Sequence, residues 1–281
     1  MKRLIVTVTL TGFAMVVAAG AWATPKDDIA QYQGYYKKRF PGVALQSYSD
    51  GVNVLPQYAA RRANWELLME FPPYEAEMDK ARAEWAKPFA NGKTFSDCFK
   101  NNPPATKYPY VDAKGDMRSV VGDVNRCLKA NGEKPIKNLK TGKIARLVAA
   151  FKEQFNGQKM AVNVNSPAAL KWYDRGKKIY WTRRGQLNFS CASCHVQNAG
   201  NQIRGDVLGA GLGQGTGFPV YRTKWMLKGK PWGTLHRRYA GCNKNVRAKP
   251  FKPQSKEYLA LEFYQAVMNT GISLKVPSQR Q

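Results

Sequence analysis

Two cysteines and a histidine form the most distinctive chemical motif in the chain. Cys191, Cys194 and His195 stand in the order Cys-Ala-Ser-Cys-His. This spacing lets both thiols form thioethers to the vinyl groups of a haem while the imidazole reaches its iron. A zinc knuckle needs a second short pair of ligands, which the sequence lacks, and a thioredoxin-like redox site has no use for the histidine. We therefore predict one covalently attached haem c, with His195 as an axial iron ligand.

The other cysteines need assignments of their own. Cys98 and Cys127 have no histidine near them, because the chain's two histidines are His195 and His236, so a second haem site of this type is excluded. In an exported chain the simplest use of the pair is a disulfide. It would close a loop of roughly thirty residues and contribute about 3 kcal/mol. Cys242 is then left as a single thiol.

Cations surround Cys242 in the sequence. They are Arg237, Arg238, Lys244 and Arg247. Such a cluster lowers the pKa of a thiol and holds it as the thiolate, which is the form that attacks sulfur and ligates metal. The alternative is a buried and inert thiol with a purely structural role.

The second axial position of the iron decides what the haem can do. A methionine ligand raises the reduction potential and suits an electron carrier, whereas a thiolate lowers it. An empty position suits a sensor of small ligands. The candidates in the second half of the chain are Cys242, Met226, Met268, His236 and a lysine. A cationic thiol beside haem favours chemistry on an anionic sulfur compound, and a mono-haem electron-transfer protein is the alternative.

The N-terminus predicts export. Lys2 and Arg3 precede an apolar run, and the small-x-small sequence Ala-Trp-Ala at 21–23 is a signal-peptidase site. We expect residues 1–23 to be a cleaved signal peptide and the mature chain to be periplasmic. The run is shorter than the ~20 apolar residues of a spanning helix, and no later segment is longer, so no membrane span is expected.

The composition is strongly basic, with a formal net charge of +26. In a cytoplasmic protein this balance would suggest nucleic acid as the partner. Export instead favours acidic proteins, small anions or a membrane surface. No nucleic acid partner is therefore expected.

Helical signals dominate the remaining sequence and predict a mainly α fold. We expect helices over 56–69, 74–86, 119–130, 143–155, 166–182 and 255–270, loops over 91–110 and 200–217, and a linker over 156–165. Ser166 before Pro167 is an N-cap signal, and Ser255 is another. The aromatic stripe of the last helix is expected to be core rather than a cofactor contact.

Several stretches together resemble the SoxA family, the catalytic cytochrome subunits of SoxAX thiosulfate-oxidising complexes. They are Arg-Gly-Gln-Leu-Asn-Phe-Ser running into the haem motif at 184–195, Pro-Val-Tyr-Arg at 219–222, Leu-His-Arg-Arg-Tyr-Ala-Gly-Cys at 235–242, Arg-Ala-Lys-Pro at 247–250, and upstream Asn-Gly-Lys-Thr-Phe at 91–95, Cys98, Tyr-Pro at 108–109 and Cys127. The resemblance thus covers most of the mature chain.

The resemblance implies two cytochrome c-like domains in pseudo-symmetric tandem, residues 24–157 and 158–281, with haem only in the second. Some family members bind another haem in the first domain. Here that motif is missing, and the pair Cys98 and Cys127 replaces the haem as a staple. Cys242 would be the second axial ligand and carry sulfur, Arg238 would face the substrate, and Arg247 would assist substrate binding.

The implied activity is that of an L-cysteine S-thiosulfotransferase. Thiosulfate would be joined oxidatively to a cysteine of a SoxYZ-type carrier protein, and the electrons would leave through haem c. The implied partners are a SoxX-type mono-haem cytochrome in a heterodimer and a downstream electron-accepting cytochrome.

Overall fold

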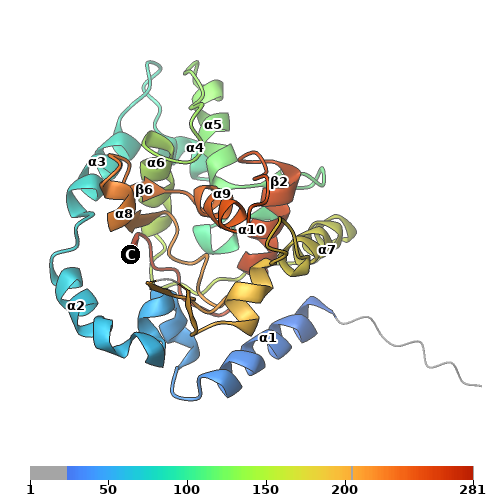
Figure 1. The fold of residues 1–281 in the computed structure, drawn as a ribbon. Coiled ribbons are helices and arrows are strands. Elements are labelled where there is room, and N and C mark those ends of the chain that lie inside the picture. The colour runs from blue at the N-terminus through green and yellow to red at the C-terminus, as the bar shows by residue number, and fades with distance from the viewer. Residues whose placement is uncertain (1–23, 204, 281) are drawn as a thin grey trace, which may run out of the picture.

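The computed structural model describes residues 24–203 and 205–280. The expected signal peptide at 1–23 lies outside the described residues. Helices carry most of the fold (Figure 1). The strands are only two or three residues long. The expected mainly α class is therefore confirmed. No helix in the described part of the chain is long and apolar enough to cross a membrane.

The helices are α1 (Pro25–Arg39), α2 (Ala59–Glu70), α3 (Glu75–Ala86), α4 (Phe95–Phe99), α5 (Val120–Ala130), α6 (Lys143–Glu153), α7 (Pro167–Trp181), α8 (Thr223–Met226), α9 (Leu235–Asn245) and α10 (Lys256–Met268). The six helices expected from the sequence are all present. The helices α1, α8 and α9 were not predicted, and α4 lies inside a stretch that was expected to be loop.

The strands are β1 (Tyr110–Val111), β2 (Met117–Arg118), β3 (Gln202–Ile203), β4 (Asp206–Val207), β5 (Val220–Arg222), β6 (Trp232–Gly233) and β7 (Ser278–Arg280). The strands β1 and β2 form one antiparallel pair, and β3 and β4 form another. In the third sheet, β5 lies between β6, which is antiparallel to it, and β7, which is parallel.

Local sequence explains where the best-predicted helices begin. The Ser166 side chain accepts a hydrogen bond from the backbone of Ala169, and Pro167 occupies the first helical position of α7. Ser255 caps α10 in the same way, with the amide of Tyr258 as donor. These caps satisfy amide groups that the first turn of a helix leaves unpaired.

Helices α3, α4, α5 and α6 pack together in the first half of the chain. Trp85 of α3 stacks on Phe95 at 5.2 Å and on Phe151 at 5.6 Å between ring centroids. A disulfide joins Cys98 of α4 to Cys127 of α5. Aromatic packing and the disulfide together hold these helices against one another.

Helices α7 and α10 form the most extensive helix pair of the second half. Gly176 permits their close crossing, because a Cβ atom there would lie 2.1 Å from the carbonyl oxygen of Ala260. The unpredicted helix α1 also joins this half, where the hydroxyls of Tyr32 and Tyr180 are 2.7 Å apart. Helix α1 therefore supports the segment that precedes the haem motif.

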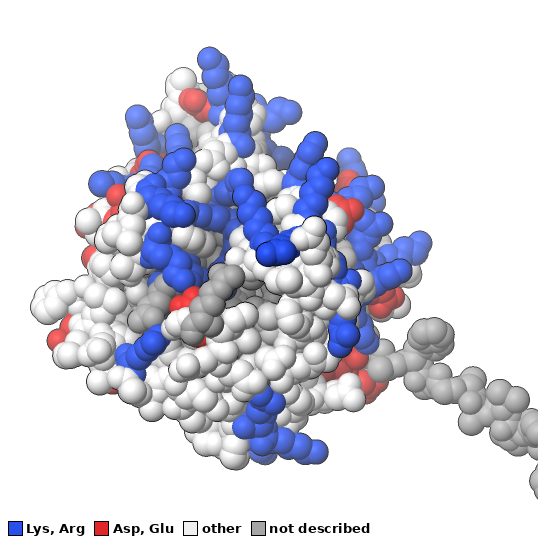
Figure 2. Space-filling model, in the orientation of Figure 1, with Lys and Arg blue, Asp and Glu red and all other residues white. Residues whose placement is uncertain are grey.

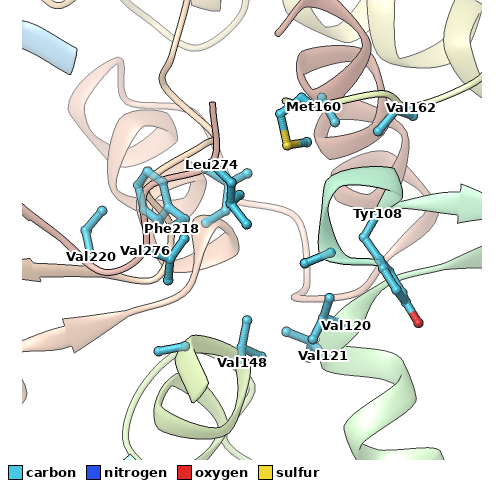
Figure 3. Close-up of a cluster of buried hydrophobic side chains, with 14 of the residues drawn as sticks. Tyr108, Val120, Val121, Val148, Met160, Val162, Phe218, Val220, Leu274 and Val276 are labelled. Carbon is cyan, nitrogen blue, oxygen red and sulfur yellow. The ribbon is translucent and has the colours of Figure 1, made fainter. Parts of the chain in front are cut away.

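One hydrophobic core connects the two halves of the chain. Figure 3 shows Val120 and Val148 from the first half in the same cluster as Phe218 and Leu274 from the second. The expected linker 156–165 is held in place, since the amide of Met160 donates to the carbonyl of Ile272 at 2.9 Å. The segment 156–165 therefore packs against the C-terminal part of the chain and is not a flexible linker.

Candidate haem site and reactive cysteine

The turn that carries the Cys-x-x-Cys-His motif fixes the histidine ring. Ser190 and Ser193 cap each other's backbone at 3.0 and 3.1 Å and start the turn. The Nδ1 atom of His195 is 2.9 Å from the carbonyl oxygen of Gly209. A carbonyl can only accept, so Nδ1 carries the hydrogen and Nε2 keeps a free lone pair. The imidazole is thus oriented and in the tautomer that can ligate iron.

The glycine-rich stretch around Gly209 and Gly211 passes directly beside this histidine. Besides Gly209, the amide of Gly211 donates to the carbonyl oxygen of His195 at 2.9 Å. The hydroxyl of Tyr36 on α1 donates to the same carbonyl. A side chain at Gly211 would meet the hydroxyl of Tyr32 at 1.9 Å, so glycine is required for this close approach.

The helix α9 brings Cys242 to the haem motif. The thiols of Cys191, Cys194 and Cys242 interact electrostatically, and Cys242 lies against the His195 side chain. All three thiols are free and partly buried. The fold therefore brings together groups from segments that are distant in sequence. They are the two attachment thiols, the imidazole of His195 and the thiol of Cys242.

The three thiols differ in acidity. Burial raises the pKa of Cys191 to about 12 and also raises the pKa of Cys194. Burial opposes ionisation of Cys242 as well, but nearby cations, Arg238 foremost and Arg222 in addition, lower the pKa of that thiol to about 6. Cys242 is therefore the thiol that is held as a thiolate at neutral pH.

Of the cations expected around Cys242, Arg238 is the one that acts on the thiol most strongly. It is half-buried and lies one turn earlier on α9. Arg237 points elsewhere: its guanidinium carbon is 3.8 Å from the Trp225 ring centroid, and the group donates to the carbonyls of Lys230 and Trp232. The structure therefore separates two neighbouring arginines that look alike in the sequence.

Lys244 and Arg247 have exposed side chains. The backbone carbonyl of Arg247 accepts a hydrogen bond from Gln186, at the start of the segment that leads into the haem motif. Arg222, at the end of β5, was missed as a site residue. Its only sequence signal is its place in the Pro-Val-Tyr-Arg stretch, since it is far from Cys242 along the chain.

The alternative axial ligands have other surroundings. Met226 is 44% exposed, and its sulfur accepts a hydrogen bond from the hydroxyl of Tyr221 at 2.9 Å. Met268 is packed in the core on α10. His236 is buried with its Nε2 atom 2.9 Å from a carboxylate oxygen of Glu262. Among the candidates named from the sequence, Cys242 is the side chain that faces His195.

The site residues fit a covalently bound haem. The two attachment thiols are free, Nε2 of His195 is available, and a thiolate lies beside it. Within residues 24–203 and 205–280, no group of three or more His, Cys, Asp and Glu side chains could hold a metal ion by itself. A zinc centre of the structural kind, which needs four such ligands, therefore has no place among these residues.

The helical fold and the oriented Cys-x-x-Cys-His histidine define the class of the protein: it is a c-type cytochrome. No protein-family model matches the chain. It is 44% identical over 256 residues to the L-cysteine S-thiosulfotransferase subunit SoxA of Chlorobaculum thiosulfatiphilum, covering 90% of this chain and 87% of the relative. The chain belongs to the SoxA family.

Two further comparisons support this membership. The SoxA subunit of Allochromatium vinosum is 39% identical over 282 residues, covering 99% of this chain and 98% of the relative. A crystal structure of SoxXA from P. pantotrophus matches with a TM-score of 0.68 at 29% identity, covering 78% of this chain and 84% of that one.

Proposed function

We propose that this chain is the subunit of an L-cysteine S-thiosulfotransferase that joins thiosulfate to a cysteine of a SoxYZ-type carrier protein. The observation that carries the proposal is the environment of Cys242, whose thiol pKa is lowered to about 6 beside His195 and Arg238. A thiolate next to a cation can take part in sulfur transfer from an anion. Membership of the SoxA family supports the same reaction.

We infer that Cys191 and Cys194 would attach one haem c and that His195 and Cys242 would hold its iron. The attachment motif occurs once in the sequence, and Cys98 and Cys127 are joined to each other. Both facts support one haem, in the second of two cytochrome c-like domains with bounds 24–157 and 158–281. When bound, the haem iron supplies the acceptor for the electrons that the coupling releases.

The coupling has a defined balance. A sulfur–sulfur bond forms between thiosulfate and the carrier cysteine, the S–H bond of that cysteine breaks, and two electrons and one proton leave. Arg238 binds the anionic substrate beside Cys242. The exposed Arg247 assists in binding the same anion. The Cys242 thiolate is the group that handles the sulfur of thiosulfate, and the reaction depends on it.

Partners and location follow from the same proposal. A SoxX-type mono-haem cytochrome would form a heterodimer with this chain and pass electrons to a downstream cytochrome. One solved relative is described as a SoxXA structure, which supports such a pair. Export through a cleaved signal peptide would place the complex in the periplasm, and the N-terminal Lys-Arg and apolar run support this location.

The exported complex, its carrier protein, thiosulfate and an oxidised electron acceptor provide the test. Intact-mass spectrometry of the carrier should show a thiosulfate adduct on its cysteine, and reduction of the acceptor should accompany it. Reduction and reoxidation of the haem without any adduct would leave only the electron-transfer function.

A further inference from the structure

Arg222 is a buried cation whose part in the proposed reaction is limited to helping lower the pKa of Cys242. It ends β5, and its amide donates to the carbonyl of Pro231 at 3.1 Å, which fixes the backbone. Its side chain is 8% exposed, and its guanidinium carbon is 5.3 Å from the Trp225 ring centroid. Among the residues that the structure describes, the buried Nε atom of Arg222 has no hydrogen-bond partner.

The charges around Arg222 do not balance its own. Arg238 and Arg280 are cations, and Asp206 and Cys242 are the anions that act on it. Asp206 is already paired with Lys224 at 3.0 Å. Burial and the nearby Arg238 lower the pKa of Arg222 to about 10, so the group is still charged at neutral pH. A buried guanidinium without a paired anion is strongly unfavourable.

An oxyanion that is always present would remove this imbalance. A haem attached through Cys191 and Cys194 carries carboxylates at the edge opposite its vinyl groups and never leaves the protein. Thiosulfate, in contrast, leaves after every turnover. Arg238 is less buried than Arg222 and adjoins Cys242, so it suits the transient anion better.

We propose that Arg222 binds a carboxylate of the haem through its Nε and guanidinium hydrogens. The planar fork of an arginine can hold both oxygens of a carboxylate. This inference rests on the covalent haem of the proposed function and not on its sulfur chemistry. Arg222 is then a haem-positioning residue, and Arg238 binds the substrate.

The proposal makes Arg222 a determinant of the haem reduction potential. A buried positive charge beside the haem favours the reduced form, which carries one positive charge fewer at iron. Removing the charge should therefore lower the potential. An exposed charge on the neighbouring segment should have no such effect because solvent and salt screen it.

The test is an equilibrium redox titration of the exported holoprotein after its covalent haem content has been measured. Arg222→Gln should have a lower midpoint potential than the unaltered protein, and Arg222→Lys, which keeps the charge, should lie between the two. Lys228→Gln removes one exposed charge close to β5 and should keep the unaltered potential.

An unaltered potential in Arg222→Gln would overturn the inference, and a raised KM for thiosulfate alone would assign Arg222 to the substrate instead. If Arg222→Gln yields no holoprotein, a crystal structure of the unaltered holoprotein decides. A haem carboxylate oxygen within hydrogen-bond distance of Nε supports the inference, and an Nε bonded elsewhere contradicts it. A protein without covalent haem would overturn the proposed function as well.

Discussion

At the scale of single residues, three free cysteines in one site have opposite chemical characters. Burial keeps Cys191 and Cys194 protonated, with raised pKa values, whereas Arg238 stabilises the thiolate of Cys242. Thiols that must stay bonded to haem vinyl groups need no activation once the bonds exist. The thiol that is to react with sulfur needs the lowered pKa.

Arg238 should contribute to catalysis rather than to folding. Arg238→Ala removes a charged contact to the anion in the transition state. It should lower kcat/KM by a factor that corresponds to a loss of about 2–4 kcal/mol in transition-state stabilisation. Arg238→Lys keeps the charge but loses the planar fork, so it should recover only part of the rate. Steady-state assays of carrier conjugation measure both.

The matched control for Arg238 is Lys252→Ala, which removes an exposed cation just beyond α9. It should keep the unaltered rate. Equal losses of kcat/KM in Arg238→Ala and Lys252→Ala would contradict this role. They would mean that the rate depends on the overall positive charge of the protein and not on a contact of Arg238 beside Cys242.

At the scale of elements, local start signals account for the prediction of α7 and α10 but not for every helix. Helix α1 was missed although Thr24 and Asp27 form a capping box at its start. Ser166 and Ser255 cap α7 and α10, and both helices were predicted. The N-cap of α9, Thr234, makes no side-chain cap bond; its amide and hydroxyl bond to the carbonyls of Lys140 and Leu139 instead. The helix that carries Cys242 therefore has little local signature.

The short strands were missed for the same reason. Strand β5 is three residues long and pairs with β7, which lies more than 50 residues later in the sequence. It is too short for an alternation of apolar and polar residues to indicate a strand. Arg222 was missed as a consequence, because only this sheet brings it to Cys242. The motif cysteines, His195 and Arg238 could be predicted because their chemistry lies in short sequence spacings.

The crossing of α7 and α10 gives a prediction for these elements. Gly176→Ala would place a Cβ atom 2.1 Å from the carbonyl oxygen of Ala260 and 2.6 Å from Cβ of Tyr264. The helices must separate, so the free energy of unfolding should fall by about 1–3 kcal/mol in denaturant titrations.

Gly34→Ala is the control for Gly176→Ala, since Gly34 is also helical and nothing lies within 4 Å of the added Cβ atom. Its free energy of unfolding should rise by about 0.5–1 kcal/mol, because alanine loses less backbone entropy in a helix. Destabilisation of both variants to the same extent would contradict the account of the crossing.

At the scale of the whole molecule, one core joins the halves and the surface is strongly basic. Lys and Arg side chains gather over the upper part of the face in Figure 2, and the formal net charge is +26. A chain of this charge attracts acidic partners over distances comparable to the Debye length. The charge therefore affects the rate of association with partners. The hydrophobic core fixes the positions of the elements that carry the site.

The disulfide should stabilise the fold without affecting the haem. Joint replacement of Cys98 and Cys127 by alanine releases a loop with a sequence separation of 29 and should lower the free energy of unfolding by about 3 kcal/mol. Covalent haem content should stay unchanged, because Cys191 and Cys194 are untouched. Loss of haem from the folded variant would contradict this division.

Association with an acidic carrier protein should slow as salt rises. Screening shortens the reach of the positive surface to about 8 Å at physiological ionic strength, so the association rate constant should fall while dissociation changes little. Stopped-flow measurements over a range of salt concentrations give both constants. An association rate that is independent of salt would rule out electrostatic steering.

Cys242→Ala tests the central claim most directly, with intact-mass spectrometry of the carrier protein as the measurement. The variant should keep its covalent haem, which depends on Cys191 and Cys194, so a folded holoprotein is available for assay. The account predicts that the carrier cysteine then acquires no thiosulfate adduct, whereas the unaltered complex produces one. An undiminished yield of adduct with Cys242→Ala would contradict the account and leave Cys242 a spare thiol in an electron carrier.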